Sequence, residues 1–436
     1  MEIFYRDKNI EQIDRRSLEE LQYKQLIYTL GFALRTPFYK TRLAQSGIYS
    51  PADIKSLKDL KKIPFTTKDD LRECYTQGLL STSIDNVVRI HTSSGTTGVP
   101  TVIYHTQEDL NNWTDLVARS ITACGVTKKD VFQNMMTYGM FTGGLGLHYG
   151  AERIGILVIP TSSGNTKRQL QIMKDFKTTV VHATPSYMFH MYSKLNEYGF
   201  KLEDLHLKKA FVGAEPYSEN SRKKIEEIFN IDVYNSYGLS EMNGPGVAFE
   251  CVYKNGMHIW EDSYIVEVID PKTEEPVKEG AEGELVLTTL KREATPILRY
   301  RTRDLALIYK DSCPCERTHR RLSRITGRTD DMLIVNGVNV FPSQIEQVIM
   351  EIPEVGNNYM INLSKQGAMD KLTVKVEIYS KLFHGDISEL EHLKAKIKDN
   401  LRASIIINPN VELHEPGSLP VFELKAKRVE DERPKL

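Results

Sequence analysis

Apolar residues change their spacing several times along this chain, and each change predicts a different kind of element. Up to about residue 85 they recur at helical spacing, as in SLEELQYKQLIYTLGFAL, which predicts helices. The segment PFTTKDDLRE predicts a further helix with Thr67 as its N-cap. Two short β-branched runs, VVRIHTS and TVIYHT, then flank the loop TSSGTTGVPT.

The loop at residues 92–101 is followed by a strand rather than by a helix. A nucleotide-binding Walker loop leads into a helix whose N-terminus faces the phosphates. We therefore expect a hairpin here, which could cradle phosphate with backbone N–H groups and Ser/Thr hydroxyls. Taken alone, a loop of this composition is more often a plain turn.

Strands and helices alternate from about residue 154 to residue 237. The predicted strands are GILVIP, TTVVHATP, KKAFVGAEP and IDVYNSYG, and the predicted helices are TKRQLQIMKDF, SYMFHMYSKLNEYG and SENSRKKIEEIF. Such alternation predicts βαβ units and a parallel sheet, hence an α/β fold. Ligands of parallel sheets bind at the carboxyl ends of the strands, where HATPS, GAEP and YGLSE lie.

The chain becomes β-rich from residue 258 to residue 310, with HIWEDSYIVEVID, GELVLTTL and PILRYRTRDLALIY. Beyond it, Asn336-Gly337 within DMLIVNGVNVF is a strong hairpin signal. The segments SQIEQVIMEI and ISELEHLKAKIKDNL predict helices, and KLTVKVEIY predicts a strand. We therefore expect a small α+β domain from about residue 331 to residue 436.

The composition narrows the class of protein and of partner. A length of 436 residues predicts more than one domain. The composition, with 40% hydrophobic and 26% charged residues, is typical of soluble globular proteins. Lys and Arg number 57 against 58 acids, and this balance disfavours a nucleic-acid partner. No apolar run approaches the roughly 18–20 residues that span a bilayer, and the first residues lack an apolar signal core. We expect a cytoplasmic protein without a membrane partner.

Five cysteines in a chain of this size do not indicate a disulfide framework, and we take Cys74 and Cys124 as reduced thiols. Three cysteines and a histidine could instead form a closed tetrahedral Zn²⁺ site of structural type. The candidate ligands are Cys251, His258, Cys313 and Cys315. His319 is an alternative to His258. We prefer His258, because His258 shares a predicted β-segment with Cys251. The spacing is not a common zinc-finger pattern, so free thiols stay open as an alternative.

Several motifs follow one another in a fixed order: SSGTTGVPT, GAEP, YGLSE, YRTRD, GRTDD and finally a lysine in FELKAKRV. This order resembles that of the acyl-adenylate-forming superfamily, which includes acyl-CoA synthetases and peptide-synthetase adenylation domains. MFTGGLGLHYGAE, TPSY and GRTDDMLIVNGVNVFPSQIE are similar to the phenylacetate–CoA ligase branch. The resemblance implies a large N-terminal adenylate-forming domain, residues 1–329, and a small mobile C-terminal domain, residues 330–436, with the hinge at Asp330. It also favours zinc, because such a site occurs in this branch.

The resemblance implies a ligase reaction in two steps. ATP first converts an aryl acid, phenylacetate being the leading candidate, to an acyl-adenylate and releases pyrophosphate. The thiol of coenzyme A then attacks, which gives the acyl-CoA thioester and AMP. Positioning and charge neutralisation dominate such chemistry. The implied catalytic residues are Lys425, Thr96 and Glu241, the last as a Mg²⁺ ligand. Leu424 stands where the family usually has glycine, which leaves Lys427 as an alternative lysine.

Further residues would contact ATP, AMP or coenzyme A if the resemblance holds. They are Ser93, Ser94, Gly95, Thr97, Gly98, Glu215, Pro216, Tyr237, Asp304, Arg328 and Gly337. Asp304 would accept hydrogen bonds from the ribose hydroxyls, with Arg328 beside it. Gly337 would let the backbone approach the pantetheine arm.

The acid pocket is expected from TYGMFTGGLG and GAEPY. Its candidate residues are Tyr138, Phe141, Gly143, Gly144 and Ala214. Aromatic walls with glycines between them suit a flat, neutral aryl group, and these segments contain no arginine or lysine. Packing in the core is the alternative explanation for the two aromatic residues.

Two other functions stay open at this point. The acyl group could pass to the thiol of a separate carrier protein, or the chain could be a zinc-stabilised sensor of a nucleotide or an aryl acid. Glu241, Asp304 and Lys425 favour an enzyme over a sensor. Indoleacetate or a hydroxyphenylacetate could replace phenylacetate, and the oligomeric state, a homodimer included, is undetermined by the sequence.

Overall fold

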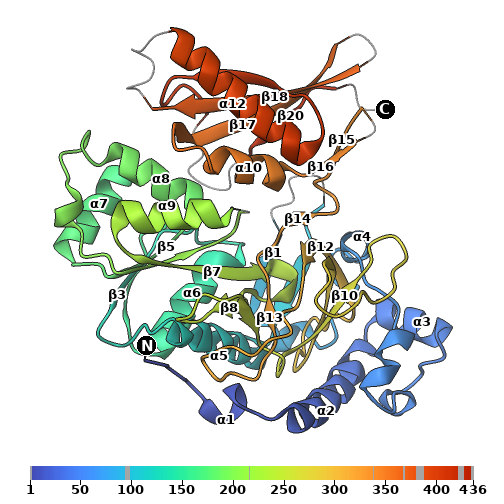
Figure 1. Cartoon of the computed structure of the whole chain (residues 1–436). Coiled ribbons are helices and arrows are strands. Elements are labelled where there is room, and N and C mark those ends of the chain that lie inside the picture. Colours follow the sequence, from blue (N-terminus) through green and yellow to red (C-terminus); the bar gives the residue numbers. More distant parts are fainter. Residues whose placement is uncertain are drawn as a thin grey trace. The chain divides into compact units, whose positions relative to one another are not determined.

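A computed structural model of the chain describes most of its residues (Figure 1). The described ranges are 2–93, 99–215, 217–336, 338–366, 369–379, 387–420 and 427–433, without the side chains of Asn357 and Ile387. The chain divides into two compact units. The first comprises residues 1–162, 178–182 and 234–325, and the second comprises residues 163–177, 183–233 and 326–436. No helix among the described residues is long and apolar enough to cross a membrane.

The first unit begins with the predicted helices. They are α1 (Lys8–Glu11), α2 (Arg15–Ala33), α3 (Pro37–Gln45) and α4 (Lys68–Glu73). Thr67 caps α4 as predicted: its side chain accepts from the Asp70 amide, and the Asp70 carboxylate accepts from the Thr67 amide in return. The two reciprocal bonds satisfy backbone donors that a helix start leaves without a partner.

The loop TSSGTTGVPT joins two antiparallel strands, which confirms the predicted hairpin. β1 (Arg89–Thr92) pairs with β2 (Val102–His105), and Thr92 lies opposite Val102. Beyond the last pair the Ser93 amide donates to the Thr101 carbonyl at 3.2 Å, and the Thr101 amide donates to the Ser93 hydroxyl at 3.1 Å. These bonds fix both ends of the loop.

Parallel strands and helices follow, of which the sequence analysis predicted the strands in GILVIP and TTVVHATP. In the first unit they are α5 (Gln107–Ala123), β3 (Val131–Asn134), α6 (Thr142–Arg153), β4 (Leu157–Ile159) and β5 (Val180–Ala183). β3 pairs in parallel with β4 and with β5. The carboxyl end of β3 therefore leads into the segment that precedes α6, where the acid pocket is expected.

The rest of the first unit is antiparallel. Its strands are β7 (Asp232–Leu239), β8 (Gly244–Glu250), β9 (Met257–Ile259), β10 (Tyr264–Ile269), β11 (Gly283–Thr289), β12 (Tyr300–Ala306) and β13 (Arg321–Leu322). β7, β8, β9 and β13 are neighbours in that order, and β10, β11 and β12 form a second series. The predicted run HIWEDSYIVEVID is interrupted, because the Ser263 and Tyr264 amides both donate to the Trp260 carbonyl and turn the chain.

The second unit contains three helices and a strand from the alternating region. They are α7 (Thr166–Asp175), α8 (Pro185–Lys194), β6 (Lys209–Val212) and α9 (Glu219–Phe229). At the start of α9, the buried Glu346 carboxylate accepts from the Ser221 hydroxyl at 2.7 Å and from the Ser218 amide at 3.2 Å. The N-terminal end of α9 is thus bonded to a residue from the C-terminal part of the chain.

The C-terminal part of the second unit has the predicted α+β elements. They are β14 (Gly327–Arg328), β15 (Leu333–Val335), β16 (Val338–Val340), α10 (Pro342–Met350), β17 (Val355–Gln366), β18 (Met369–Ile378), α12 (Ile387–Ile405), β19 (Asn410–His414) and β20 (Val429–Asp431). β15 and β16 form the predicted hairpin, and β19, β18, β17 and β20 form a sheet in that order. Ile345, Ile361, Val374 and Ile397 are fully buried within this part, so it has a hydrophobic core of its own.

Candidate active site and metal centre

Two motifs that lie far apart in the sequence meet at a buried hydrogen bond. Tyr237, near the end of β7, donates its hydroxyl to the Asp304 carboxylate on β12 at 2.7 Å. Both side chains are buried, and the Asp304 amide donates to the Thr302 hydroxyl at 3.1 Å. The structure therefore brings YGLSE and YRTRD together.

Glu241 lies in a short 3₁₀ turn, Ser240–Met242, between β7 and β8. Its side chain is buried, and one carboxylate oxygen accepts from the Thr101 hydroxyl at 3.2 Å. Its backbone carbonyl accepts from the Arg292 guanidinium at 2.7 Å. Because Thr101 ends the loop TSSGTTGVPT, the predicted magnesium carboxylate lies beside the predicted phosphate loop.

The predicted acid pocket contains a small polar network. Asn134, at the end of β3, donates its side-chain amide to the Tyr138 hydroxyl at 2.9 Å and to the Gly144 carbonyl at 2.7 Å. The Tyr138 hydroxyl also lies 3.1 Å from His148 Nδ1. Burial raises the pKa of Tyr138 to about 12, so its phenol stays neutral at physiological pH.

Phe141 and Ala214 lie in special positions. Phe141 precedes α6 and is 42% exposed, which rules out core packing as the explanation for this residue. Ala214 has a φ of +67°, a conformation that favours glycine. Next to it the Glu215 carboxylate accepts from the Ser186 amide at 2.7 Å. Ala214 and Glu215 belong to the second unit, whereas Tyr138 and Phe141 belong to the first.

Arg328 forms a bidentate ion pair with the proposed hinge residue Asp330, at 2.9 and 3.0 Å, within the second unit. Its place beside Asp304 stays a prediction. Several predicted residues lie outside the described residues. They are Ser94, Gly95, Thr96, Thr97, Gly98, Pro216, Gly337 and Lys425. The alternative lysine, Lys427, is described and exposed.

The four predicted zinc ligands come together. Cys251, His258, Cys313 and Cys315 are buried, and their ligand atoms all lie within 4.8 Å of one another. Cys315 Sγ lies 3.2 Å from His258 Nε2, and Cys251 Sγ lies 3.7 Å from Cys313 Sγ. Hydrogen bonds from Cys251 and the neighbouring donors hold the pKa of the Cys315 thiol below its ordinary value.

The geometry distinguishes between the two candidate histidines. His258 Nδ1 bonds to the His319 carbonyl at 3.1 Å, which directs Nε2 to the sulfur atoms. Both ring nitrogens of His319 have other partners, the Glu261 amide and the Ile10 carbonyl, each at 3.0 Å. His319 thus lies outside the cluster, as the sequence analysis preferred.

The loop that carries Cys313 and Cys315 also holds the first residues of the chain. The Tyr5 hydroxyl donates to the Cys315 carbonyl at 2.6 Å. Arg317 forms a fully buried ion pair with Glu11 at 2.7 Å. With the bond between His319 and Ile10, these contacts clasp the segment from Tyr5 to Glu11 against the cysteine loop.

Sequence reasoning missed four residues of this region: Thr101, Asn134, His148 and Arg292. Thr101 and His148 stand inside quoted motifs, but no signal assigned them a role. Asn134 ends β3, a strand that the sequence analysis did not predict, so its place at the carboxyl end of a parallel strand became visible only in the structure. Arg292, in the segment KREA, has the sequence context of an exposed charge, and only the structure shows that it is buried.

Comparison with known proteins identifies the family. The model of the AMP-binding enzyme family matches residues 41–290, and the model of its C-terminal domain matches residues 337–433. Phenylacetate–coenzyme A ligase of Aromatoleum evansii is 43% identical, over 98% of this chain and 97% of its own. The enzymes of the same name from Thermus thermophilus and Escherichia coli K12 are 42% and 41% identical, and each alignment covers 97% of this chain.

Solved structures agree with this similarity. A 2-hydroxyisobutyryl-CoA ligase in the postadenylation state, in complex with 2-HIB-AMP, aligns with a TM-score of 0.92 at 26% identity, over 98% of this chain and 92% of its own. The same ligase with 2-HIB-AMP and CoA in the thioesterification state aligns with a TM-score of 0.72. Fold, site geometry and sequence identity together show that the chain belongs to the AMP-binding enzymes and, within them, to the family of phenylacetate–CoA ligases.

Proposed function

We propose that this chain activates phenylacetate with ATP and transfers the acyl group to coenzyme A. In the first step the acid carboxylate attacks the α-phosphorus, the bond to the bridging oxygen breaks, and pyrophosphate leaves. In the second step the coenzyme A thiol loses its proton and attacks the acyl carbonyl, and AMP leaves. One observation carries the proposal: hydrogen bonds join Tyr237 to Asp304 and Glu241 to Thr101 in a single unit.

Asp304 is proposed to hold the ribose of the nucleotide. A carboxylate accepts up to about four hydrogen bonds, so the bond from Tyr237 is compatible with two further bonds from ribose hydroxyls. The bond from Tyr237 also fixes the orientation of the carboxylate. A preorganised acceptor loses little conformational entropy when the nucleotide binds.

Glu241 is proposed to hold Mg²⁺, which would neutralise phosphate charge when it is bound. The residues fit such an ion, because Mg²⁺ in phosphoryl-transfer sites is bound through one or two carboxylates together with phosphates and water. The carboxylate of Glu241 accepts from the Thr101 hydroxyl, at the end of the predicted phosphate loop, and the Glu241 backbone carbonyl accepts from Arg292. The turn can therefore present a fixed oxygen ligand at the place where the triphosphate is expected.

Tyr138, Phe141, Gly143 and Gly144 are proposed to form one wall of the acid pocket. The exposed ring of Phe141 and the neutral phenol of Tyr138 support a substrate whose aryl group is uncharged. The names of the curated relatives support phenylacetate over the other aryl acids. A panel of phenylacetate, hydroxyphenylacetate and indoleacetate, assayed for ATP- and CoA-dependent thioester formation, tests this choice. A higher kcat/KM for either of the others would contradict it.

Lys425 is proposed to contact the acid carboxylate and the α-phosphate during the first step only. The C-terminal domain would then turn about Asp330 and withdraw the lysine, so that Gly337 could line the path of the pantetheine arm. The existence of both a postadenylation and a thioesterification state of 2-hydroxyisobutyryl-CoA ligase supports such an alternation. The bidentate pair between Asp330 and Arg328 would have to accommodate the turn.

Separate assays of the two half-reactions test these assignments. Lys425→Ala should lower phenylacetate-dependent exchange of pyrophosphate into ATP by roughly 10² or more, the scale for one preorganised charge. Lys425→Ala should still convert synthetic phenylacetyl-AMP and CoA to thioester at a near-normal rate. Lys427→Ala is the matched control, and its pyrophosphate exchange should be normal. Equal loss of both half-reactions in Lys425→Ala would refute the withdrawn lysine. Exchange without thioester formation in the wild type would indicate transfer to a carrier protein, and no exchange would indicate a sensor.

We also propose that the cysteine cluster holds a structural Zn²⁺. Three thiols and one imidazole are a donor set typical of closed structural zinc sites, and the four atoms already lie close together. Zinc there would tie together the loops before β9 and β13. Metal analysis of protein purified without added metal tests this, and less than about 0.3 equivalents of zinc would contradict it.

The cytoplasmic location and the homodimer are further proposals. ATP and CoA as substrates support a cytoplasmic location, which cell fractionation would test. Light scattering behind a size-exclusion column would distinguish a homodimer from the 49.8 kDa monomer.

A further inference from the structure

Arg292 is a fully buried arginine in the loop that follows β11. It is 2% exposed, and its Nη1 donates to the Glu241 carbonyl at 2.7 Å. Among the described residues, its Nε and Nη2 have no hydrogen-bond partner. A buried cation that relies on one backbone carbonyl is costly, because burial removes its hydration without an ion pair in return.

Other buried arginines of the first unit are paired with acids. Arg119 makes two bonds to Asp262, at 2.6 and 3.2 Å, and Arg299 makes two bonds to Glu267, at 3.0 and 2.9 Å. Arg292 forms no ion pair with any residue that the structure describes. The charges of Arg119 and Arg299 are thus neutralised within the fold, whereas that of Arg292 is not neutralised by a described residue. This contrast points to a function for Arg292.

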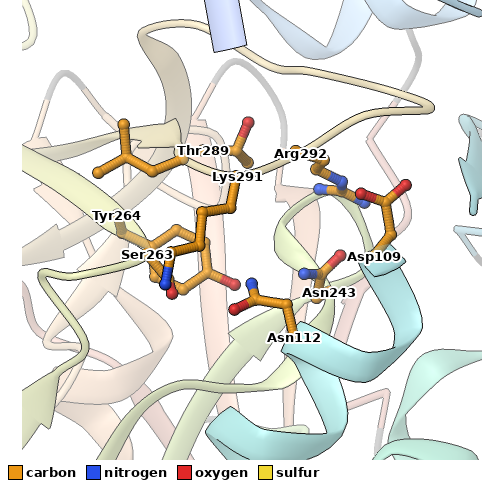
Figure 2. A pocket seen from close by; sticks show the side chains of 9 residues that line it. Asp109, Asn112, Asn243, Ser263, Tyr264, Thr289, Lys291 and Arg292 are labelled. Carbon is orange, nitrogen blue, oxygen red and sulfur yellow. The ribbon is translucent and has the colours of Figure 1, made fainter. Parts of the chain in front are cut away.

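Arg292 lines a narrow polar pocket together with Asp109, Asn243 and Ser263. Figure 2 shows its guanidinium directed toward Asp109, whose carboxylate is occupied by the amides of Thr106, Glu293 and Ala294. Two more buried polar atoms in the lining, Asn243 Oδ1 and Ser263 Oγ, lack a partner among the described residues. Asn243 ends the turn that carries Glu241 and has a φ of +68°.

The turn Ser240–Met242 is held through its backbone carbonyls. Arg292 bonds the carbonyl of Glu241, and the Tyr264 hydroxyl bonds the carbonyl of Met242, each at 2.7 Å. Neither bond occupies the Glu241 carboxylate, which faces the Thr101 hydroxyl instead. The two bonds can therefore fix the turn while its carboxylate binds an ion.

We propose that Arg292 is a positioning residue for the adenylation step: it holds the turn that carries Glu241 and places a buried positive charge beside that turn. The proposal rests on the proposed role of Glu241. A cation in low-dielectric surroundings stabilises nearby negative charge more than an exposed one does. Triphosphate is present only before the adenylate forms, so the effect of Arg292 belongs to the first half-reaction.

The test compares Arg292→Gln, Arg292→Lys and Tyr264→Phe with the wild type in both half-reactions. Arg292→Gln should lower pyrophosphate exchange roughly tenfold or more and raise the Mg²⁺ concentration needed for half-maximal exchange, because the turn is no longer fixed. Arg292→Lys keeps the charge and should recover part of the loss. Tyr264→Phe should give a smaller loss of the same kind. Thioester formation from synthetic phenylacetyl-AMP should stay within about twofold in all three.

Arg119→Gln is the matched control, since it removes a buried arginine that bonds to Asp262 and not to the Glu241 turn. It should lower the thermal unfolding temperature without a change in the ratio of the two half-reactions. An equal fall of both half-reactions in the Arg292 and Tyr264 variants, or an unchanged Mg²⁺ dependence, would overturn the proposal. Glu241→Gln distinguishes a failure of the proposed magnesium role from a failure of the inference about Arg292. If Glu241→Gln retains full pyrophosphate exchange, the proposed magnesium role of Glu241 fails. If it abolishes exchange while Arg292→Gln does not impair it, only the inference about Arg292 fails.

Discussion

Two neighbouring glycines at the start of α6 provide a matched test of the acid pocket. A Cβ at Gly143 would meet Met136 Cε at 3.9 Å, which is an ordinary contact. A Cβ at Gly144 would lie 2.6 Å from the Thr137 carbonyl oxygen, closer than real Cβ atoms approach. The Gly144 carbonyl accepts from the Asn134 amide, which also donates to Tyr138. A shift at Gly144 would therefore reach the pocket.

The expected stabilities follow from these distances. Replacing a helical glycine by alanine gains about 0.5–1 kcal/mol. Gly143→Ala should keep this gain. Gly144→Ala forces backbone apart, which costs about 1–3 kcal/mol. The net effect of Gly144→Ala is a loss of up to roughly 2.5 kcal/mol, after the helical gain is subtracted.

Thermal unfolding and steady-state kinetics measure both consequences. Gly144→Ala should unfold at a lower temperature and show a several-fold higher KM for phenylacetate, whereas Gly143→Ala should match or exceed the stability of the wild type. If the two variants have the same unfolding temperature and the same KM, the close approach to Thr137 or its link to the pocket is wrong.

Three further changes have defined outcomes. Cys315→Ser should lose bound zinc and unfold at a lower temperature, because structural zinc contributes folding free energy, whereas Cys124→Ser should keep its metal; equal metal content in both variants would contradict the assignment. Burial raises the pKa of Glu346 from 4.5 to about 7, so its contribution to stability is present below pH 4.5 and is lost as the pH rises through about 7. The unfolding temperature of the wild type should therefore fall as the pH rises through this range, and the fall should be smaller in Glu346→Gln. The same pH profile in both proteins would contradict the role of Glu346. Ala214→Gly should stabilise the chain by roughly 0.5–1 kcal/mol, because it removes a Cβ from a positive φ, and a lower unfolding temperature would argue against this reasoning.

The order of elements was predictable because it rests on local signals. Period changes marked the boundary between helical and strand segments, and SENSRKKIEEIF became α9 (Glu219–Phe229). A strand after the glycine-rich loop was enough to predict the hairpin of β1 and β2. The interruption between β9 and β10 was not predictable, because the turn at Trp260 has no glycine or proline to announce it.

The site divides in the same way. Tyr237, Glu241 and Asp304 stand in motifs, so their type and order were visible in the sequence. The Arg292 bond to the Glu241 carbonyl was not visible, because it depends on burial and on a partner 51 positions away. The cysteine cluster was predictable in part. The sequence suggested the four residues and favoured His258, but only the fold shows that His258 belongs to the cluster and His319 does not.

The clasp between the segment from Tyr5 to Glu11 and the cysteine loop has a consequence for synthesis. Tyr5 and its partner Cys315 are 310 positions apart, and Glu11 and Arg317 are 306 apart. At about 5–20 residues per second, a ribosome needs roughly 15–60 s to pass from one to the other. Glu11 therefore emerges well before Arg317, the residue whose charge neutralises it in the folded chain. During synthesis the contact cannot form until the cysteine loop has been made, whereas refolding from denaturant involves no such delay.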